Sequence, residues 1–268
     1  MQPVSDARAV VIVVGGTTGI GAAIVERLLA EHHAVVSVGL AGSASEAAEG
    51  EATERAAGVE QVIGDARSVE TIDRAIAVAI ASAERRSVAI AGLIHVAGGS
   101  GRSLGDGPLD AITDSGWSGT LDWNLGSVFL SNRAIVRHWL ATNSGGSVVN
   151  LGSVLARSPA PEHFATHAYA AAKAGLIGLT TACAAHYAPH DLRFNAILPG
   201  LIDTPMARRA IGDPTIRDYL QRKQPLRGGG PGHPDDVAAL ATWLVSPAAR
   251  WITGQTIAVD GGWSVSEG

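Results

Sequence analysis

Short runs of Val, Ile and Leu alternate along the chain with longer stretches rich in Ala and Leu. The runs are almost continuously apolar, as in strands that helices cover on both faces of a sheet. In the stretch 22–32, Ile24, Leu28 and Leu29 fall on one helical face, while the charged residues fall elsewhere. We therefore expect helices between seven strands, at 9–14, 34–38, 59–63, 92–96, 147–151, 192–197 and 255–259.

Strands that alternate with helices form parallel sheets through right-handed βαβ crossovers. The pattern predicts an α/β fold: a single Rossmann-type, doubly wound domain over residues 1–268, with a seven-stranded parallel sheet flanked by helices. In such folds the ligand crevice lies at the carboxyl ends of the strands. The stretches 154–168 and 200–228 follow strand ends and have no obvious regular structure, so we expect them to form the substrate walls.

Composition excludes several classes of protein. With 46% hydrophobic and 17% charged residues, the chain does not resemble a disordered one. The net charge of −5, without a basic stripe, argues against nucleic-acid binding. No apolar run approaches the roughly 18 residues that cross a bilayer, and the first apolar stretch reads as a strand, not a signal peptide. We expect a soluble, cytoplasmic protein with no membrane partner.

The residues offer little support for a metal site. A single cysteine, Cys183, excludes an intramolecular disulfide and a cysteine-based zinc cage, and its apolar surroundings predict a buried side chain. His163 and His167 have the i, i+4 spacing of metal ligands, but no third ligand lies nearby in the sequence. We expect no bound metal. These two histidines either line the substrate pocket or belong to a solvated loop.

A glycine-rich turn follows the first predicted strand and opens a helix. Gly15, Gly19 and Gly21 give a GxxxGxG spacing. Gly15 would allow the tight turn, Gly19 the close approach of a pyrophosphate, and Gly21 the packing of the helix on the strand. The first N–H groups of the helix would then bind phosphates. We expect nucleotide binding by Gly15, Thr17, Thr18, Gly19, Ile20 and Gly21, although a turn without a ligand has the same pattern.

The end of the second predicted strand bears on the choice of nucleotide. An acidic residue there would bind the adenosine ribose and favour NAD, but the position holds Gly39. No arginine follows closely to pair with the 2′-phosphate of NADP. The pattern leaves both NAD and NADP open and favours NAD slightly.

Tyr169 and Lys173 are four positions apart in an alanine-rich stretch, so they share one face of a helix. A nearby ammonium lowers the pKa of a phenol, which would let Tyr169 exchange protons near neutral pH. Tyr219 and Lys223 have the same spacing, so the spacing alone is not diagnostic. The second pair lies in a charged segment that reads as a solvated helix, and we favour the first as catalytic.

These motifs, in this order over nearly the whole chain, resemble the short-chain dehydrogenase/reductase family in its roughly 250-residue form. The glycine loop is similar to the family's cofactor turn, and the segment 150–153 resembles the strand end that carries the catalytic serine. The segments 195–200 and 260–263 resemble the family's nicotinamide-holding and C-terminal signatures. The resemblance implies cofactor contacts from Gly39, Asp65, Ala66, Ala97, Gly98, Tyr169, Lys173, Pro199, Gly200, Ile202 and Thr204.

The resemblance also implies a catalytic tetrad of Asn124, Ser153, Tyr169 and Lys173. Tyr169 would exchange the proton while the nicotinamide exchanges a hydride with a secondary alcohol or ketone. Ser153 would stabilise charge on the substrate oxygen, and Lys173 would lower the pKa of Tyr169 and hold the nicotinamide ribose. Asn124 would anchor a water that links Lys173 to solvent.

The chain departs from the family pattern at the centre of the sheet. Val14 stands in place of a threonine, and His95 and Val96 stand in place of two asparagines, so the usual brace between these strands is missing or replaced by packing. Ser153 and Tyr169 are 16 positions apart, a few more than is usual, which predicts an enlarged substrate loop.

Other interpretations remain open. The chain could be a nucleotide-binding regulator that has lost catalysis, or a lyase or dehalogenase on the same fold, although the tetrad and the glycine loop argue against these. Arg102, Arg208 and Arg209 either face an anionic part of the substrate or are solvated. Family members are commonly tetramers, and the apolar run 168–185 fits such an interface, so we expect a homotetramer or, failing that, a dimer.

Overall fold

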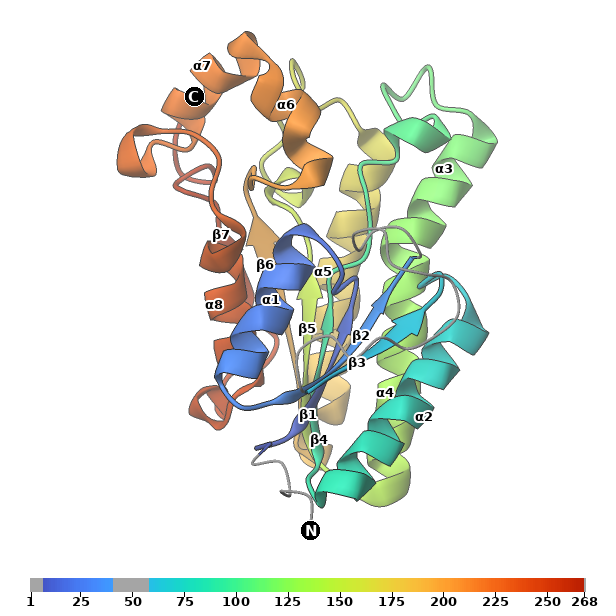
Figure 1. Cartoon of the computed structure of the whole chain (residues 1–268). Coiled ribbons are helices and arrows are strands. Elements are labelled where there is room, and N and C mark those ends of the chain that lie inside the picture. The colour runs from blue at the N-terminus through green and yellow to red at the C-terminus, as the bar shows by residue number, and fades with distance from the viewer. Residues whose placement is uncertain (1–6, 41–57, 268) are drawn as a thin grey trace.

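The seven apolar runs form one parallel sheet in a computed structural model that describes residues 7–40 and 58–267 (Figure 1). The strand order is β3-β2-β1-β4-β5-β6-β7. Strands are added in one direction from β1 to β3 and in the other direction from β4 to β7, while β1 and β4 stay parallel. This confirms the predicted α/β, doubly wound architecture. The strands are β1 (Val10–Val14), β2 (Ala34–Gly39), β3 (Val59–Ile63), β4 (Ile90–His95), β5 (Gly146–Leu151), β6 (Leu192–Pro199) and β7 (Thr256–Val259).

The β2–β3 connection, 41–57, lies outside the described residues, and helices connect the other strands as predicted. They are α1 (Gly19–Ala30), α2 (Val69–Arg86), α3 (Asp114–Leu121), α4 (Ser127–Thr142), α5 (His167–Tyr187), α6 (Arg208–Gly212), α7 (Pro214–Lys223) and α8 (Pro234–Val245). Helix α6 lies in 200–228, where no regular structure was expected, whereas α7 contains the charged segment around Tyr219 that the sequence predicts to be helical. The capping residue Asp213, whose side chain accepts the N–H of Thr215, and Pro214 at the first helical position mark the start of α7.

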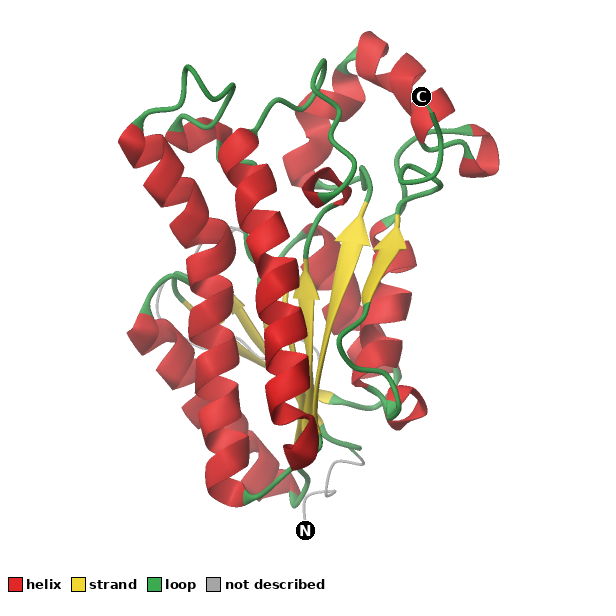
Figure 2. Ribbon diagram, turned by 180° about the vertical axis from the view of Figure 1, so that it is seen from behind, coloured by secondary structure: helices red, strands yellow, loops and turns green. Residues whose placement is uncertain are grey.

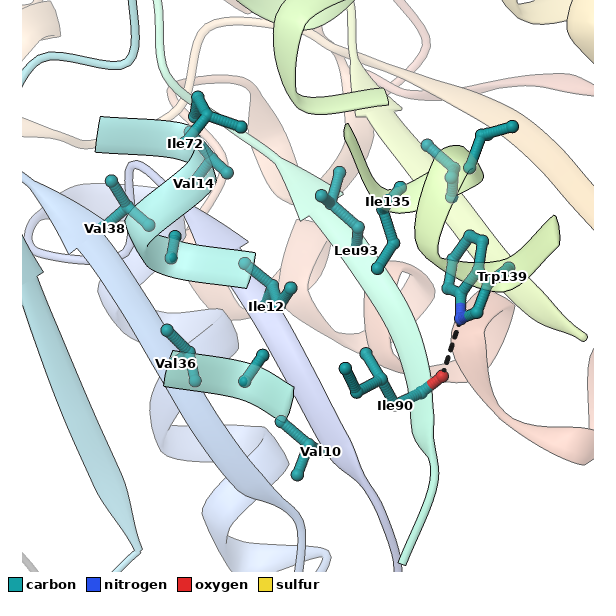
Figure 3. Packing of buried hydrophobic residues seen from close by; sticks show 14 of the residues in the cluster. Val10, Ile12, Val14, Val36, Val38, Ile72, Ile90, Leu93, Ile135 and Trp139 are labelled. Carbon is teal, nitrogen blue, oxygen red and sulfur yellow. Dashed lines mark hydrogen bonds between the residues drawn. The ribbon is translucent and has the colours of Figure 1, made fainter. Parts of the chain in front are cut away.

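Helices cover both faces of the sheet (Figures 1 and 2). Side chains alternate along β1, so Ile12 faces the layer of α2 and α4, in a buried cluster that also contains Leu93, Ile135 and Trp139 (Figure 3). Val11 faces the opposite layer of α1 and α8. The predicted face of α1 is confirmed, since Ile24 and Leu28 are fully buried there, although the helix begins at Gly19 rather than at 22.

The end of β4 is tied to α4 through a buried histidine. Nδ1 of His95 lies 2.8 Å from the hydroxyl of Ser131, and Nε2 lies 3.2 Å from the hydroxyl of Ser127. Burial, reinforced by the charge of Lys173, lowers the pKa of His95 to about 3. The neutral ring supplies one donor and one acceptor to the two serines. The usual brace between two strands is thus replaced by hydrogen bonds from β4 to α4, rather than by packing alone.

Helix α5 departs from two expectations. By length and composition, the stretch His167–His190 could cross a membrane, with a mean hydropathy of 1.2, whereas the sequence analysis expected no such run. Small residues supply much of this apolar character, and the helix packs on β6 and buries Leu176. Cys183 is partly exposed rather than buried, because it lies at the margin of the core.

Candidate functional site

A cavity of about 450 Å³ opens at the carboxyl ends of the strands. Segments that follow the strands β1 to β6 form its walls together with α5 and α6, as the doubly wound topology predicts. Both expected substrate segments contribute, through Leu155 and Phe164 from one and Met206 and Ala207 from the other. The predicted site residues on its walls are Gly15, Thr17, Thr18, Gly19, Ile20, Gly39, Asp65, Ala66, Ala97, Gly98, Ser153, Tyr169, Lys173, Pro199, Gly200, Ile202 and Thr204.

The glycine loop brings the start of α1 to this cavity. Gly15 has φ +88°, and a Cβ there would lie 2.6 Å from the backbone nitrogen of Ala97, so the turn requires glycine. Gly21 does not line the cavity; a Cβ on it would overlap the carbonyl oxygen of Gly15. Thr18 caps α1 without a side-chain hydrogen bond, which leaves the first N–H groups for a ligand. These donors and the helix dipole fit the phosphates of a dinucleotide.

Past the carboxyl end of β3, the cavity wall carries a carboxylate. Both oxygens of Asp65 accept hydrogen bonds from the guanidinium of Arg67, the shortest at 2.6 Å. The hydrogen bonds from Arg67 hold the pKa of Asp65 below its ordinary value. A Cβ at Gly39 would overlap the side chain of Thr17, so this position cannot hold the acid of other dinucleotide folds without rearrangement.

Ser153, Tyr169 and Lys173 converge on the cavity from β5 and α5. The hydroxyl of Ser153 accepts the N–H of Leu155 at 3.2 Å, and the side chain of Ser153 acts on the phenol of Tyr169 in the direction that favours the phenolate. Nζ of Lys173 lies 5.6 Å from the centre of the Tyr169 ring and donates a 2.8 Å hydrogen bond to the carbonyl of Leu151. The ammonium is therefore one helical turn from the phenol and points to the same crevice.

The pKa of Tyr169 is not lowered as expected. Desolvation by the surrounding protein raises it above its ordinary value, and the hydrogen bond to Ser153 opposes that rise. The same desolvation lowers the pKa of Lys173 to about 8. The spacing of Tyr169 and Lys173 indicates a nearby cation, whereas burial depends on the assembled fold, and burial has the larger effect on the pKa.

Asn124 lies behind the cavity rather than on its wall. It sits in a π-helix (Asp122–Gly126) between α3 and α4 and is fully buried. Its amide accepts from the N–H of Gly99 at 3.1 Å and donates to the carbonyls of Gly99 and Thr120. Gly98 separates it from Lys173, since a Cβ there would be 2.6 Å from Oδ1 of Asn124 and 3.4 Å from Nζ of Lys173. Asn124 thus holds the loop after β4 close to the lysine.

Asp106 is a site residue that the sequence analysis missed. Its buried carboxylate accepts the N–H of Ala168 at 3.0 Å and the N–H of Tyr169 at 2.9 Å. A carboxylate at a helix N-terminus satisfies free donors and complements the helix dipole. Asp106 is far from α5 in the sequence, so no local pattern could have indicated this contact.

An aromatic cluster closes the substrate side. Phe164 and Trp263 line the cavity, with ring centres 5.8 Å apart. Neither His163 nor His167 is on the wall of the cavity. The ring of His163 packs on the ring of Tyr219, with 4.7 Å between the ring centres, and His167 is the first residue of α5. The second tyrosine–lysine pair is structural, because Tyr219 contacts Trp263 and Lys223 donates to the carbonyl of Ser266.

Comparison with known proteins agrees with this geometry. The family model described as Enoyl-(Acyl carrier protein) reductase matches residues 14–264. Cis-4-hydroxycyclohexanecarboxylate dehydrogenase of Sinomonas cyclohexanicum is 32% identical over 261 residues, which cover 96% of this chain and 97% of that protein. The chain belongs to the short-chain dehydrogenase/reductase family. It is therefore an oxidoreductase that works with a nicotinamide cofactor.

The matches to two further proteins cover different shares of this chain. The 3beta-hydroxysteroid dehydrogenase 1 of Eggerthella lenta is 40% identical over 161 residues, and the match spans 60% of each protein. A solved short-chain dehydrogenase/reductase from Mycobacterium ulcerans superposes with a TM-score of 0.82 at 25% identity, covering 98% of this chain and 92% of that one. The fold and the family agree, whereas the substrates named for these relatives are chemically diverse.

Proposed function

We propose that this enzyme interconverts a secondary alcohol and a ketone, with Tyr169 as general acid and base. The observation that carries the proposal is the convergence of Ser153, Tyr169 and Lys173 on the cavity that the glycine loop also lines, with Nζ of Lys173 5.6 Å from the centre of the Tyr169 ring. The names of the hydroxysteroid and hydroxycyclohexanecarboxylate dehydrogenases support a hydroxyl group on a ring as the reacting centre. We take residues 1–268 as one domain that serves cofactor and substrate together.

In this mechanism the bound nicotinamide supplies or accepts the hydride. During oxidation, Tyr169 takes the hydroxyl proton while the carbinol carbon loses its hydride, and the alcohol becomes a ketone. During reduction, Tyr169 returns the proton to the carbonyl oxygen. Ser153 donates a hydrogen bond to that oxygen, where charge develops. The ammonium of Lys173 stabilises the phenolate as it forms, because the two groups are only one helical turn apart.

The walls of the cavity support an assignment of the cofactor's parts. The N–H groups after Gly15, Thr17, Thr18, Gly19 and Ile20 would bind the pyrophosphate. Asp65 and Ala66, with Gly39, would contact the adenosine, and Ala97 and Gly98 would line the path to the nicotinamide. Lys173 and Tyr169 would hold the nicotinamide ribose, while the nicotinamide ring would lie against Pro199, Gly200, Ile202 and Thr204.

We favour NAD over NADP. Among the described residues that line the cavity, the only Lys or Arg side chains are Arg102, Lys173 and Arg209, none of which follows β2 or β3. Arg67, the arginine beside the adenosine end, is held by Asp65 in a two-point contact. A 2′-phosphate would lack a free cationic partner from these residues. The segment 41–57 lies outside the described residues and takes no part in this argument.

Assembly and compartment are also proposals. The exposed face of α5 carries small side chains, among them Ala171, Ala174 and Gly178, at helical spacing. Two such faces could pack closely, which supports a homotetramer, with a dimer as the alternative. We place the enzyme in the cytoplasm, in keeping with its single cysteine.

A panel of alcohols and ketones, measured with both NAD(H) and NADP(H) at the nicotinamide absorbance band, tests the proposal. We expect turnover of a cyclic secondary alcohol, with a higher kcat/KM for NAD⁺. Cofactor binding without any turnover would favour the inactive regulator instead. Failure to bind either cofactor, measured by fluorescence titration, would favour a lyase or dehalogenase that uses none.

A further inference from the structure

Two arginines from separate elements line the substrate side of the cavity. Arg102 begins the 3-10 helix Arg102–Leu104 in the loop after β4, and Arg209 lies on α6. Both line the same cavity as Tyr169 and Ser153. The inference below rests on the proposed function, because it concerns the molecule that this site converts.

Neither guanidinium has a carboxylate partner within 4.0 Å among the residues that the structure describes. Within the described residues, Arg102 donates one hydrogen bond, to the carbonyl of His163 at 3.5 Å. Asp106 attracts Arg102 electrostatically, but both its oxygens accept N–H groups of α5. Asp213, near Arg209, accepts hydrogen bonds from Thr215 instead.

The two charges also act on each other. Burial, and then the charge of Arg209, lower the pKa of the Arg102 guanidinium. Two like charges at one cavity destabilise each other, and an anion between them would remove that repulsion. A planar guanidinium is also the side chain best suited to hold a carboxylate through two parallel hydrogen bonds.

Much of the substrate wall is apolar. Leu155, Phe164 and Trp263 line the cavity on this side, and Trp263 is almost completely buried. Such a wall suits a hydrocarbon ring or chain rather than a sugar, whose many hydroxyls would lose hydrogen bonds there. A substrate that fits both features has an apolar body with one anionic group.

We propose that Arg102 and Arg209 bind a carboxylate of the substrate, so that the enzyme acts on a hydroxy acid or keto acid with an apolar ring or chain. The carboxylate lies between the loop after β4 and α6, and the reacting hydroxyl lies at Tyr169. The two arginines then set the orientation of the substrate as well as its charge.

Binding measurements on the enzyme with its reduced cofactor test this inference without requiring turnover. The probes are cyclohexanecarboxylate and the uncharged cyclohexanecarboxamide, titrated calorimetrically or against the fluorescence of the bound reduced nicotinamide. We expect the carboxylate to bind at least tenfold more tightly. Arg102→Gln and Arg209→Gln should each weaken carboxylate binding about 10- to 100-fold and leave carboxamide binding unchanged, as loss of a charge-assisted hydrogen bond predicts.

Arg208→Gln is the matched control, because Arg208 is exposed like its neighbour Arg209 on α6 but does not line the cavity. It should leave the binding of both probes unchanged. Equal affinity for the two probes, or no measurable carboxylate binding, would overturn the inference. So would Arg102→Gln and Arg209→Gln variants that weaken only cofactor binding, because the arginines would then serve the cofactor phosphates.

The outcome is separable from that of the proposed function. An enzyme that oxidises neutral cyclic alcohols but does not discriminate between the probes refutes the carboxylate site alone. An enzyme that binds the carboxylate through both arginines but keeps its turnover in Tyr169→Phe refutes the catalytic assignment alone.

Discussion

The carboxylate of Asp106 accepts the backbone N–H of Tyr169 at 2.9 Å, across 63 positions of sequence. The loop that carries Arg102 and the helix that carries the phenol are therefore fastened to each other. Because the acceptor is charged and almost completely buried, this contact fixes where α5 begins and how deeply Tyr169 reaches into the cavity.

Replacement of Asp106 should separate positioning from binding. In Asp106→Asn only one side-chain oxygen remains to accept the two N–H groups, so we expect kcat to fall about tenfold while KM for the cofactor stays unchanged. Asp106→Ala should also lower the free energy of unfolding by about 1–2 kcal/mol, as loss of a helix cap does. Steady-state kinetics and urea unfolding measure the two effects. Asp110→Asn, on the exposed part of the same loop, is the control, and a wild-type kcat in Asp106→Asn would contradict the role.

Removal of the Tyr169 hydroxyl should abolish most of the activity. Tyr169→Phe keeps the ring and loses the proton carrier, so we expect kcat to fall about 10²- to 10⁴-fold with the cofactor Kd little changed. The chain contains its own control, since Tyr219 has the same lysine spacing but its hydroxyl is not part of the cavity. Tyr219→Phe should retain its turnover. A Tyr169→Phe variant with most of its turnover would refute the mechanism.

Ser153 should control the pH dependence of alcohol oxidation. Burial raises the pKa of Tyr169 and the hydrogen bond to Ser153 lowers it. Oxidation requires a phenol that can accept a proton, so its rate should rise with pH towards the alkaline side. In Ser153→Ala the opposing hydrogen bond is lost, and the rise should move to higher pH in addition to a lower kcat. A pH–rate profile of kcat measures the shift; a profile unchanged in position would show that Ser153 does not act on the phenol.

His95 should make the protein sensitive to acid. Its pKa is about 3 in the folded chain, against 6.5 for an ordinary histidine, so below pH 6.5 the unfolded chain binds a proton that the folded chain does not. The stability is complete above pH 6.5 and is lost progressively as the pH falls towards 3. Between pH 6.5 and 5, this residue should remove about 2 kcal/mol from the free energy of unfolding.

Urea unfolding at pH 7.5 and pH 5 measures this loss. His95→Asn should be less stable than the wild type at pH 7.5 but should lose less stability on acidification. His190→Asn, at an exposed position, should follow the wild type at both pH values. An equal pH dependence in His95→Asn and the wild type would mean that the imidazole is accessible to protons in the folded protein.

The exposed face of α5 should govern assembly. A charged side chain at Ala174 would be buried against a second copy, so Ala174→Arg should reduce the mass found by sedimentation velocity. Ala77→Arg places the same substitution on an exposed position of α2 and should leave the mass unchanged. If the wild type is itself a monomer, or if Ala174→Arg assembles normally, the proposed interface is wrong.

The sheet was predictable because most of its strands, such as β1 and β2, are apolar on both faces, and this pattern can be seen in the sequence without knowledge of the neighbouring strands. The same holds for the glycine turn at Gly15 and for the pair Tyr169 and Lys173, whose spacing alone brings them onto one helical face. Contacts between distant segments were not predictable. The acceptor role of Asp106 and the approach of Arg102 to Arg209 depend on where separate loops meet above the sheet.

The prediction of a lowered pKa for Tyr169 was wrong for a related reason. The sequence contains the cation beside Tyr169 but not the walls that remove water from the phenol, so the direction of the pKa shift came out wrong. Likewise, His95 could be seen to replace an asparagine, whereas its partners Ser127 and Ser131 come from the next helix. Both results depend on burial, which is a property of the assembled fold.

The π-helix Asp122–Gly126, whose turn is wider than that of an α-helix, affects how this enzyme tolerates the deletion of a residue. Each residue of a regular helix turns the chain by about 100°. Deleting one residue of this turn would let α3 and α4 merge into an uninterrupted helix, and it would swing the amide of Asn124 away from Gly99. A one-residue deletion here would thus remove the contact between Asn124 and the loop after β4 while both helices are kept. The same deletion within β4 or β5 would shift the register of the sheet.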